Sequence, residues 1–146
     1  MSHQIPDRIN IDKNDRELYN KLSKEIFEGK TRKEQFLFAM AIGFKNGIMR
    51  PLKTKEGFFL IKDLRPEDEA LLNAVAMFVK GPEILSSKEE VFKIAEEYAH
   101  AGIKILIDEI EASSFGSFAK KFERDLFELF EKLGLGGEYD QKNSLS

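Results

Sequence analysis

The sequence predicts a mainly α-helical protein: a single helical domain of about five to six helices with one or two short strands near the N-terminus. Apolar residues recur at helical spacing along most of the chain, and Thr/Ser-x-x-Glu capping boxes mark helix starts at Thr31 and Ser87. Pro66, followed by three acidic residues, opens another helix. The 146 residues suit one domain, which we place at 1–133, with a flexible tail at 134–146.

The elements follow in a simple order. Residues 8–12, RINID, alternate polar and apolar side chains, as a short half-buried strand does. A helix is predicted over 14–28, with Gly29 placed to end it. The next helix, 32–45, is apolar on most of its faces, so we expect it at the centre of the domain. A short strand is predicted at 58–61.

The second half of the chain is helical. The helix that begins at Pro66 ends near Lys80, and the one after Ser87 runs to about His100 before a break or kink at Gly102. A last amphipathic helix covers 117–133. Its apolar face consists of Phe118, Phe122, Leu126, Leu129, Phe130 and Leu133.

Composition excludes several classes of function. Hydrophobic residues make up 42% of the chain and 13 of them are Phe, which is enough to form a core. Cysteine is absent, so disulfides, Cys-based zinc sites and thiol catalysis are impossible. The N-terminus lacks the apolar stretch of a signal peptide, and no apolar run is long enough for a bilayer. We therefore expect a cytoplasmic protein without a membrane partner.

The letters GKT at Gly29–Thr31 resemble the end of a phosphate-binding P-loop. A P-loop requires another Gly five residues before Gly29, where Lys24 stands, and a strand leading in, where we predict a helix. Thr31 is better explained as a helix cap that exchanges hydrogen bonds with Glu34. The sequence therefore predicts a turn between two helices and no nucleotide cofactor.

No catalytic or metal site is predicted. Glu97 and His100 match the Glu-x-x-His spacing of di-iron bundles, but that chemistry needs the motif twice, and the other histidine is His3. A solvated charged stripe explains the neighbouring polar residues better: Glu96, His100, Lys104 and Asp108. No Cys or Gly-x-Ser-x-Gly nucleophile is present, so we expect a protein that is not an enzyme.

Charge divides the chain. Residues 1–58 hold 12 Lys/Arg and 8 Asp/Glu, a net charge of +4, whereas residues 59–146 carry −7. The overall charge is −3. A basic first part on an acidic remainder indicates where a polyanion would bind.

The first 45 residues resemble a ribbon-helix-helix unit in their order of strand, helix, turn and capped helix, and TRKEQFLFA is similar to that family's second helix. In that family two strands pair across a dimer and enter the major groove, while the second helix holds a phosphate at its N-terminus. The resemblance implies that Arg8 and Asn10, with Asp12 beside them, read bases and that Thr31, Arg32 and Lys33 hold a phosphate. The basic charge of the first part of the chain adds Lys30 to the predicted DNA contacts.

Two features depart from that family. Leu37 and Phe38 are apolar where an exposed helix would be polar, and Asp12 on the base-reading face is unfavourable to DNA. The alternative is a strand-capped helical hairpin that does not contact nucleic acid.

A second resemblance covers more of the chain. The stretches FLFAMAIGFKNGIMRPL, EDEALLNAVAM and EEYAHAGIKIL, spanning roughly 30–112, look like the small proteins associated with DNA phosphorothioation (Dnd) systems. It implies a non-enzymatic accessory protein of a DNA-modification and restriction system, with DNA and other proteins of the system as partners. The alternative is a helical adaptor that binds proteins without contacting DNA. Most of the phenylalanines are expected in the core, and a remainder on the last helix is expected to form the seam of a homodimer.

Overall fold

A computed structural model describes residues 6–112 and 115–134 of the chain. Five α-helices and one two-stranded antiparallel sheet near the N-terminus make up the described part, so the mainly α prediction is confirmed. In order, the elements are β1 Arg8–Asp12, η1 Lys13–Asp15, α1 Arg16–Ser23, α2 Arg32–Asn46, β2 Lys55–Leu60, η2 Ile61–Asp63, α3 Pro66–Lys80, η3 Pro82–Ser86, α4 Lys88–Ala112 and α5 Phe115–Lys132. The tail predicted at 134–146 lies outside the described residues except for Gly134.

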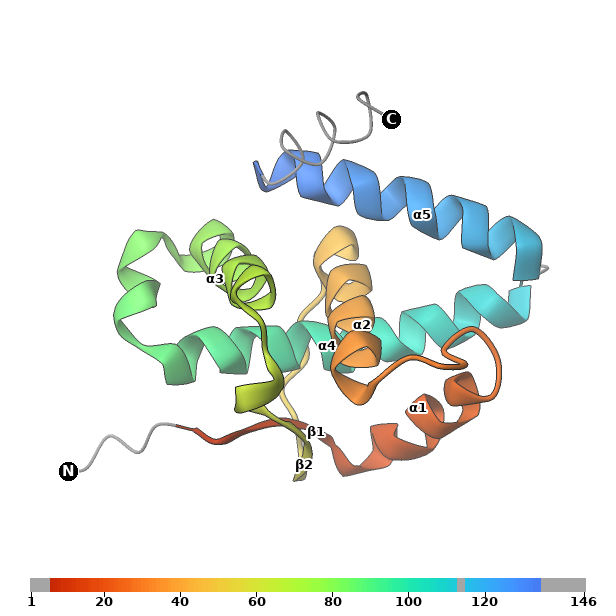
Figure 1. Ribbon diagram of the computed structural model, residues 1–146, viewed down its shortest axis with the longest axis horizontal. Helices are drawn as coiled ribbons and strands as arrows, with labels where there is room; N and C mark the ends of the chain where they lie inside the picture. The colour runs from red at the N-terminus through yellow and green to blue at the C-terminus, as the bar shows by residue number, and fades with distance from the viewer. Residues whose placement is uncertain (1–5, 113–114, 135–146) are drawn as a thin grey trace.

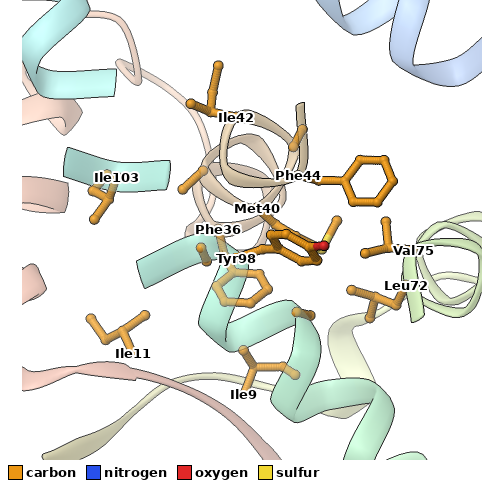
Figure 2. Close-up of a cluster of buried hydrophobic side chains, with 14 of the residues drawn as sticks. Ile9, Ile11, Phe36, Met40, Ile42, Phe44, Leu72, Val75, Tyr98 and Ile103 are labelled. Atoms are coloured by element: carbon orange, nitrogen blue, oxygen red, sulfur yellow. The ribbon is translucent and has the colours of Figure 1, made fainter. Parts of the chain in front are cut away.

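Helix α2 lies at the centre, as its apolar girth predicts. It crosses α4, with α5 on one side of the crossing and the two strands on the other (Figure 1). Side chains of α2, α3, α4 and β1 meet in one cluster around this crossing (Figure 2). Phe36 and Met40 of α2 are fully buried there, together with Leu72 of α3 and Ile9 of β1.

Two glycines set the distance between α2 and α4. A Cβ on Gly102 of α4 would overlap the carbonyl oxygen of Ala39, and a Cβ on Gly43 of α2 would overlap that of Tyr98. The break predicted at Gly102 is therefore wrong, because α4 is one continuous helix over 25 residues. The glycine serves the close packing of two helices instead of ending one.

Helix α1 is shorter than the predicted 14–28. It ends at Ser23, and residues 24–29 form turns in which the Leu22 carbonyl accepts from the N–H groups of Glu25 and Phe27. These turns direct Phe27 into the core, where it is 1% exposed and meets Phe38 edge-to-face at 5.1 Å.

The fold accounts for the two apolar residues that depart from the ribbon-helix-helix pattern, one of them through the last helix. The ring of Phe38 stacks on that of Phe122 of α5, with centroids 3.4 Å apart, and Leu37 is half-buried against the core. Leu129 is buried and Leu126 partly so. The described part of the face proposed as a homodimer seam therefore packs largely within the chain.

Candidate nucleic-acid interface

A groove of about 530 Å³ lies between the start of α2, strand β2 and the start of α3. We call it the α2 groove, and its lining residues are Thr31, Arg32, Lys33, Phe58, Phe59, Leu60, Asp63 and Arg65. Three of the eight are cations and one is an anion, on a floor of three apolar residues. An apolar surface with a few converging charged groups is typical of a binding site.

Arg32 is held in place at this groove. Its Nη1 atom donates to the carbonyl oxygen of Phe58 at 3.3 Å, and its guanidinium lies 5.3 Å from the centre of the Phe58 ring. The guanidinium of Arg16 also approaches this ring, at 5.8 Å, while bonding to Glu56 and to the Gly57 carbonyl. Arg16 is thus paired with a carboxylate. Arg32 has no carboxylate partner within the described chain, and most of its N–H donors are free.

Lys33 connects the two walls of the groove. Its Nζ lies 2.8 Å from Oδ2 of Asp68, with both side chains 15% exposed. The same Asp68 oxygen accepts from the backbone N–H of Arg65 at 2.9 Å. One carboxylate oxygen therefore ties the first turn of α2 to the first turn of α3. Lys33 is paired, and Arg65 is the cation that lines the groove from the other wall.

The capping box predicted at Thr31 is confirmed. Glu34 N–H donates to Thr31 Oγ1 at 3.2 Å, and Thr31 N–H donates to Glu34 Oε1 at 2.9 Å. This hydrogen bond, with Lys30 and Lys33 nearby, lowers the pKa of Glu34. The box satisfies two of the four free backbone N–H groups at this helix start, so an anion there has fewer backbone donors and relies more on the arginine side chains. The GKT letters form a turn, with Gly29 at a φ of +78°, as expected.

The six predicted nucleic-acid residues fall into two groups. Thr31, Arg32 and Lys33 line the groove, and Lys30 is exposed in the turn before it. Arg8 and Asn10 lie on β1 and do not line the groove. Sequence reasoning missed Arg65, whose only signal was that it directly precedes Pro66 at a helix start.

Strand β1 differs from the strand of a ribbon-helix-helix unit. It pairs antiparallel with β2 of its own chain, with Ile9 opposite Phe59 and Ile11 opposite Glu56. The backbone N–H of Asn10 donates to Glu96 Oε2 of α4 at 2.7 Å, whereas Arg8 is exposed. In ribbon-helix-helix proteins the strand pairs with the same strand of a second chain. Here β1 pairs with β2 of its own chain.

A base-reading side chain has to be exposed, but Asp12 is buried. It is 1% exposed, and its carboxylate accepts from the backbone N–H groups of Asn14, Lys53 and Thr54. Burial alone would raise the pKa of Asp12, but these three donors outweigh it, and the pKa lies below its ordinary value.

A second polar cluster joins β1 and η1 to α4. His100 Nδ1 lies 2.6 Å from Oδ2 of Asp15, and His100 Nε2 lies 3.9 Å from Oδ2 of Asp12. Burial raises the pKa of Asp15 despite the histidine beside it. Tyr19, one turn beyond Asp15, is 1% exposed, and its hydroxyl has no hydrogen-bond partner in the described structure.

Glu96 completes this cluster on α4. It is 6% exposed, and burial raises its pKa to about 7, although the Asn10 N–H opposes the shift. The predicted solvated stripe is therefore wrong for Glu96 and His100, which face β1 and η1, while Lys104 and Asp108 are exposed as predicted. The sequence could not predict that Asp15 and His100 lie together, because 85 residues separate them.

The cluster anchors the N-terminal strand to α4. His100 with Asp15 has the geometry of an acid–base pair, but no serine, threonine or lysine nucleophile is bonded to it among the described residues. No group of three or more His, Cys, Asp or Glu residues in 6–112 and 115–134 is arranged to hold a metal ion. In the same part of the chain, no helix combines the length and hydropathy that a bilayer crossing requires.

Comparison with known proteins identifies one family. The profile of a family described as DNA sulphur modification system-associated protein 4 matches residues 8–120, which extends the resemblance read from 30–112 at both ends. The matched segment contains the α2 groove and the polar cluster around Asp15, Glu96 and His100, and it ends within α5. Neither a curated protein nor a solved structure matches the chain.

Proposed function

Because the chain belongs to the family of DNA sulphur modification system-associated protein 4, we propose that it is a non-enzymatic accessory protein of such a system and contacts the DNA backbone through the α2 groove. The observation that carries the proposal is the convergence of Arg32 and Arg65 on one groove from the starts of two helices. Guanidinium groups bind phosphate with two parallel N–H donors, which makes arginine suited to this contact.

The charge distribution supports an approach from this side. The first 58 residues carry +4 and the remainder −7, so a polyanion is attracted to the basic part and repelled elsewhere. Lys30 is exposed in the turn before α2 and adds to the attraction without a carboxylate of its own in the described part of the chain. Lys33 contributes less, because Asp68 neutralises it.

The first test is the salt dependence of DNA binding. We expect fluorescence anisotropy with a short labelled duplex to show affinity falling between about 50 and 200 mM salt, with a log–log slope of about −0.9 per phosphate neutralised. Replacing Arg32 and Arg65 together with Ala should flatten the slope by roughly 2 if each meets one phosphate. Because these contacts read no bases, the loss should be similar for every sequence.

Lys104→Ala is the matched control, since Lys104 is exposed on α4 and lines no part of the groove. It should leave the slope unchanged. An identical slope in wild type and in the Arg32/Arg65 double variant contradicts DNA contact through this groove. Plain and phosphorothioated duplexes in the same series show whether the modification itself changes affinity.

Exposed apolar side chains favour a second candidate, the helical adaptor. Phe78 of α3 is 56% exposed and Met77 beside it 38%, whereas the core otherwise buries most large apolar residues. Lys132 lies 4.9 Å from the Phe78 ring. The adaptor predicts no DNA binding even at low salt, and binding of another protein of the system that is lost in Phe78→Ser.

A further inference from the structure

The dimensions and lining of the α2 groove indicate what part of DNA enters it. We propose that the groove takes a single nucleotide unit of a strand that has left the double helix, with its phosphate on Arg32 and Arg65 and its sugar over β2. This inference rests on the proposed function and specifies its ligand. The volume of about 530 Å³ lies within the range of small-molecule sites, roughly 300–1,000 Å³, and suits one nucleotide.

The cationic end of the groove is preorganised for one phosphate. The Phe58 carbonyl and ring hold the Arg32 guanidinium at 3.3 and 5.3 Å. Asp68 fixes the backbone of Arg65 and, through Lys33, the spacing of the two walls. Positions set in advance reduce the entropy lost when a phosphate is bound.

The floor determines how the rest of the nucleotide lies. Phe58 and Phe59 are 4% and 8% exposed, too little for a base to stack on either ring, and Leu60 is half-buried. The floor therefore offers apolar contact to a sugar and no platform that would distinguish bases.

The groove also contains one carboxylate. Asp63 repels a second phosphate and accepts hydrogen bonds from N–H or O–H groups, so the phosphate is directed to the arginines and the polar edge of the nucleoside to Asp63. An intact duplex presents its phosphates on a convex surface with the bases stacked inside. It can reach the rim of the groove, whereas a strand released from pairing can enter.

The test compares one sequence as a labelled single strand and as a duplex, in fluorescence anisotropy at equal low salt. We expect the single strand to bind about tenfold more tightly. Thymidylyl-thymidine, the dinucleotide, should displace it, whereas thymidine without phosphate should not. The phosphorothioate dinucleotide is a second arm that reports whether sulphur in place of one oxygen is accepted.

Leu60→Ser distinguishes binding inside the groove from binding to the arginines, because it removes part of the apolar floor and leaves Arg32 and Arg65 unchanged. It should weaken single-strand binding severalfold and leave duplex binding unchanged, with Lys104→Ala as the control. If duplex and single strand bind equally and the dinucleotide does not compete, the single-nucleotide inference is wrong while DNA contact stands. If no form of DNA binds at low salt, the proposed function fails and the inference with it. The dinucleotide competition uses wild-type protein, so it holds even if Leu60→Ser does not fold.

Discussion

Ionisation of the buried Glu96 carboxyl is coupled to folding. Its buried carboxyl has a pKa raised from 4.5 to about 7, so the folded state binds a proton more tightly than the unfolded chain. The stabilisation from that proton is complete below about pH 4.5 and is lost as pH rises through 7. A pKa difference of this size corresponds to about 3 kcal/mol of unfolding free energy.

Glu96→Gln should therefore flatten the dependence of stability on pH. The amide keeps an acceptor for the Asn10 N–H and cannot ionise, so we expect the variant to gain stability relative to wild type between about pH 5 and pH 8. Urea unfolding across this range measures the difference. Glu97→Gln, at the half-buried neighbouring position, is the control and should track wild type. Parallel stability curves for wild type and Glu96→Gln would show that the carboxyl is not protonated in the fold.

Thr31 acts as a structural cap beside the groove. Thr31→Ala removes the acceptor of the Glu34 N–H and should cost about 0.5–2 kcal/mol, while Thr31→Ser retains it and should stay close to wild type. Thermal melts of the three proteins measure this order. The cap would have no energetic role if the Ala variant melted with the other two.

At the scale of elements, the crossing of α2 and α4 depends on two positions without a side chain. Gly102→Ala improves helix propensity by up to about 1 kcal/mol, yet its Cβ would overlap the Ala39 carbonyl. We expect the steric term to dominate and the variant to lose about 1–3 kcal/mol, as overpacked cores do. Lys104→Ala, exposed on the same helix, should be nearly neutral. Denaturant unfolding of wild type and the two variants measures which effect is larger. A stabilised Gly102→Ala would show that the two helices can move apart at little cost.

The periodicity of α4 was predictable but its surroundings were not. The i, i+4 spacing of Glu96 and His100 is typical of a solvated stripe, and their burial depends on Asn10, Asp12 and Asp15 far earlier in the chain. Likewise, a glycine inside a helix and a glycine that ends one look alike until the partner helix is known. For this reason the sequence predicts a break at Gly102 that α4 does not have.

At the scale of the whole molecule, protection should decrease outward from the crossing. Helices α2 and α4 carry most of the buried apolar side chains of the described residues, whereas α5 contacts the rest mainly along one face. We expect native-state hydrogen exchange to be slowest in α2 and α4, faster in α5, and faster still in the turns at 24–29. Exchange in α5 as slow as in α4 would contradict this order.

Local signals accounted for much of the architecture. The alternation of 8–12, the Thr31 box and Pro66 each correctly marked an element, because caps and periodicity act within a few residues. Three of the eight residues that line the groove, Thr31, Arg32 and Lys33, are consecutive and were named from the sequence, and their binding role stays a prediction. Arg65 and the Asp68 link required the packing of α3 against α2, which no local pattern contains.

The shared oxygen of Asp68 couples the two walls of the groove energetically. Lys33 and the Arg65 backbone both use it, so removing the carboxylate breaks both contacts, and removing Lys33 weakens the hold on the other wall. In a double-mutant cycle such a pair shows a coupling energy, typically 0.5–3 kcal/mol for directly contacting residues. Asp68→Ala should therefore cost more than Lys33→Ala, because Lys33→Ala leaves the Arg65 N–H bonded to Asp68, and adding Lys33→Ala to Asp68→Ala should cost little more.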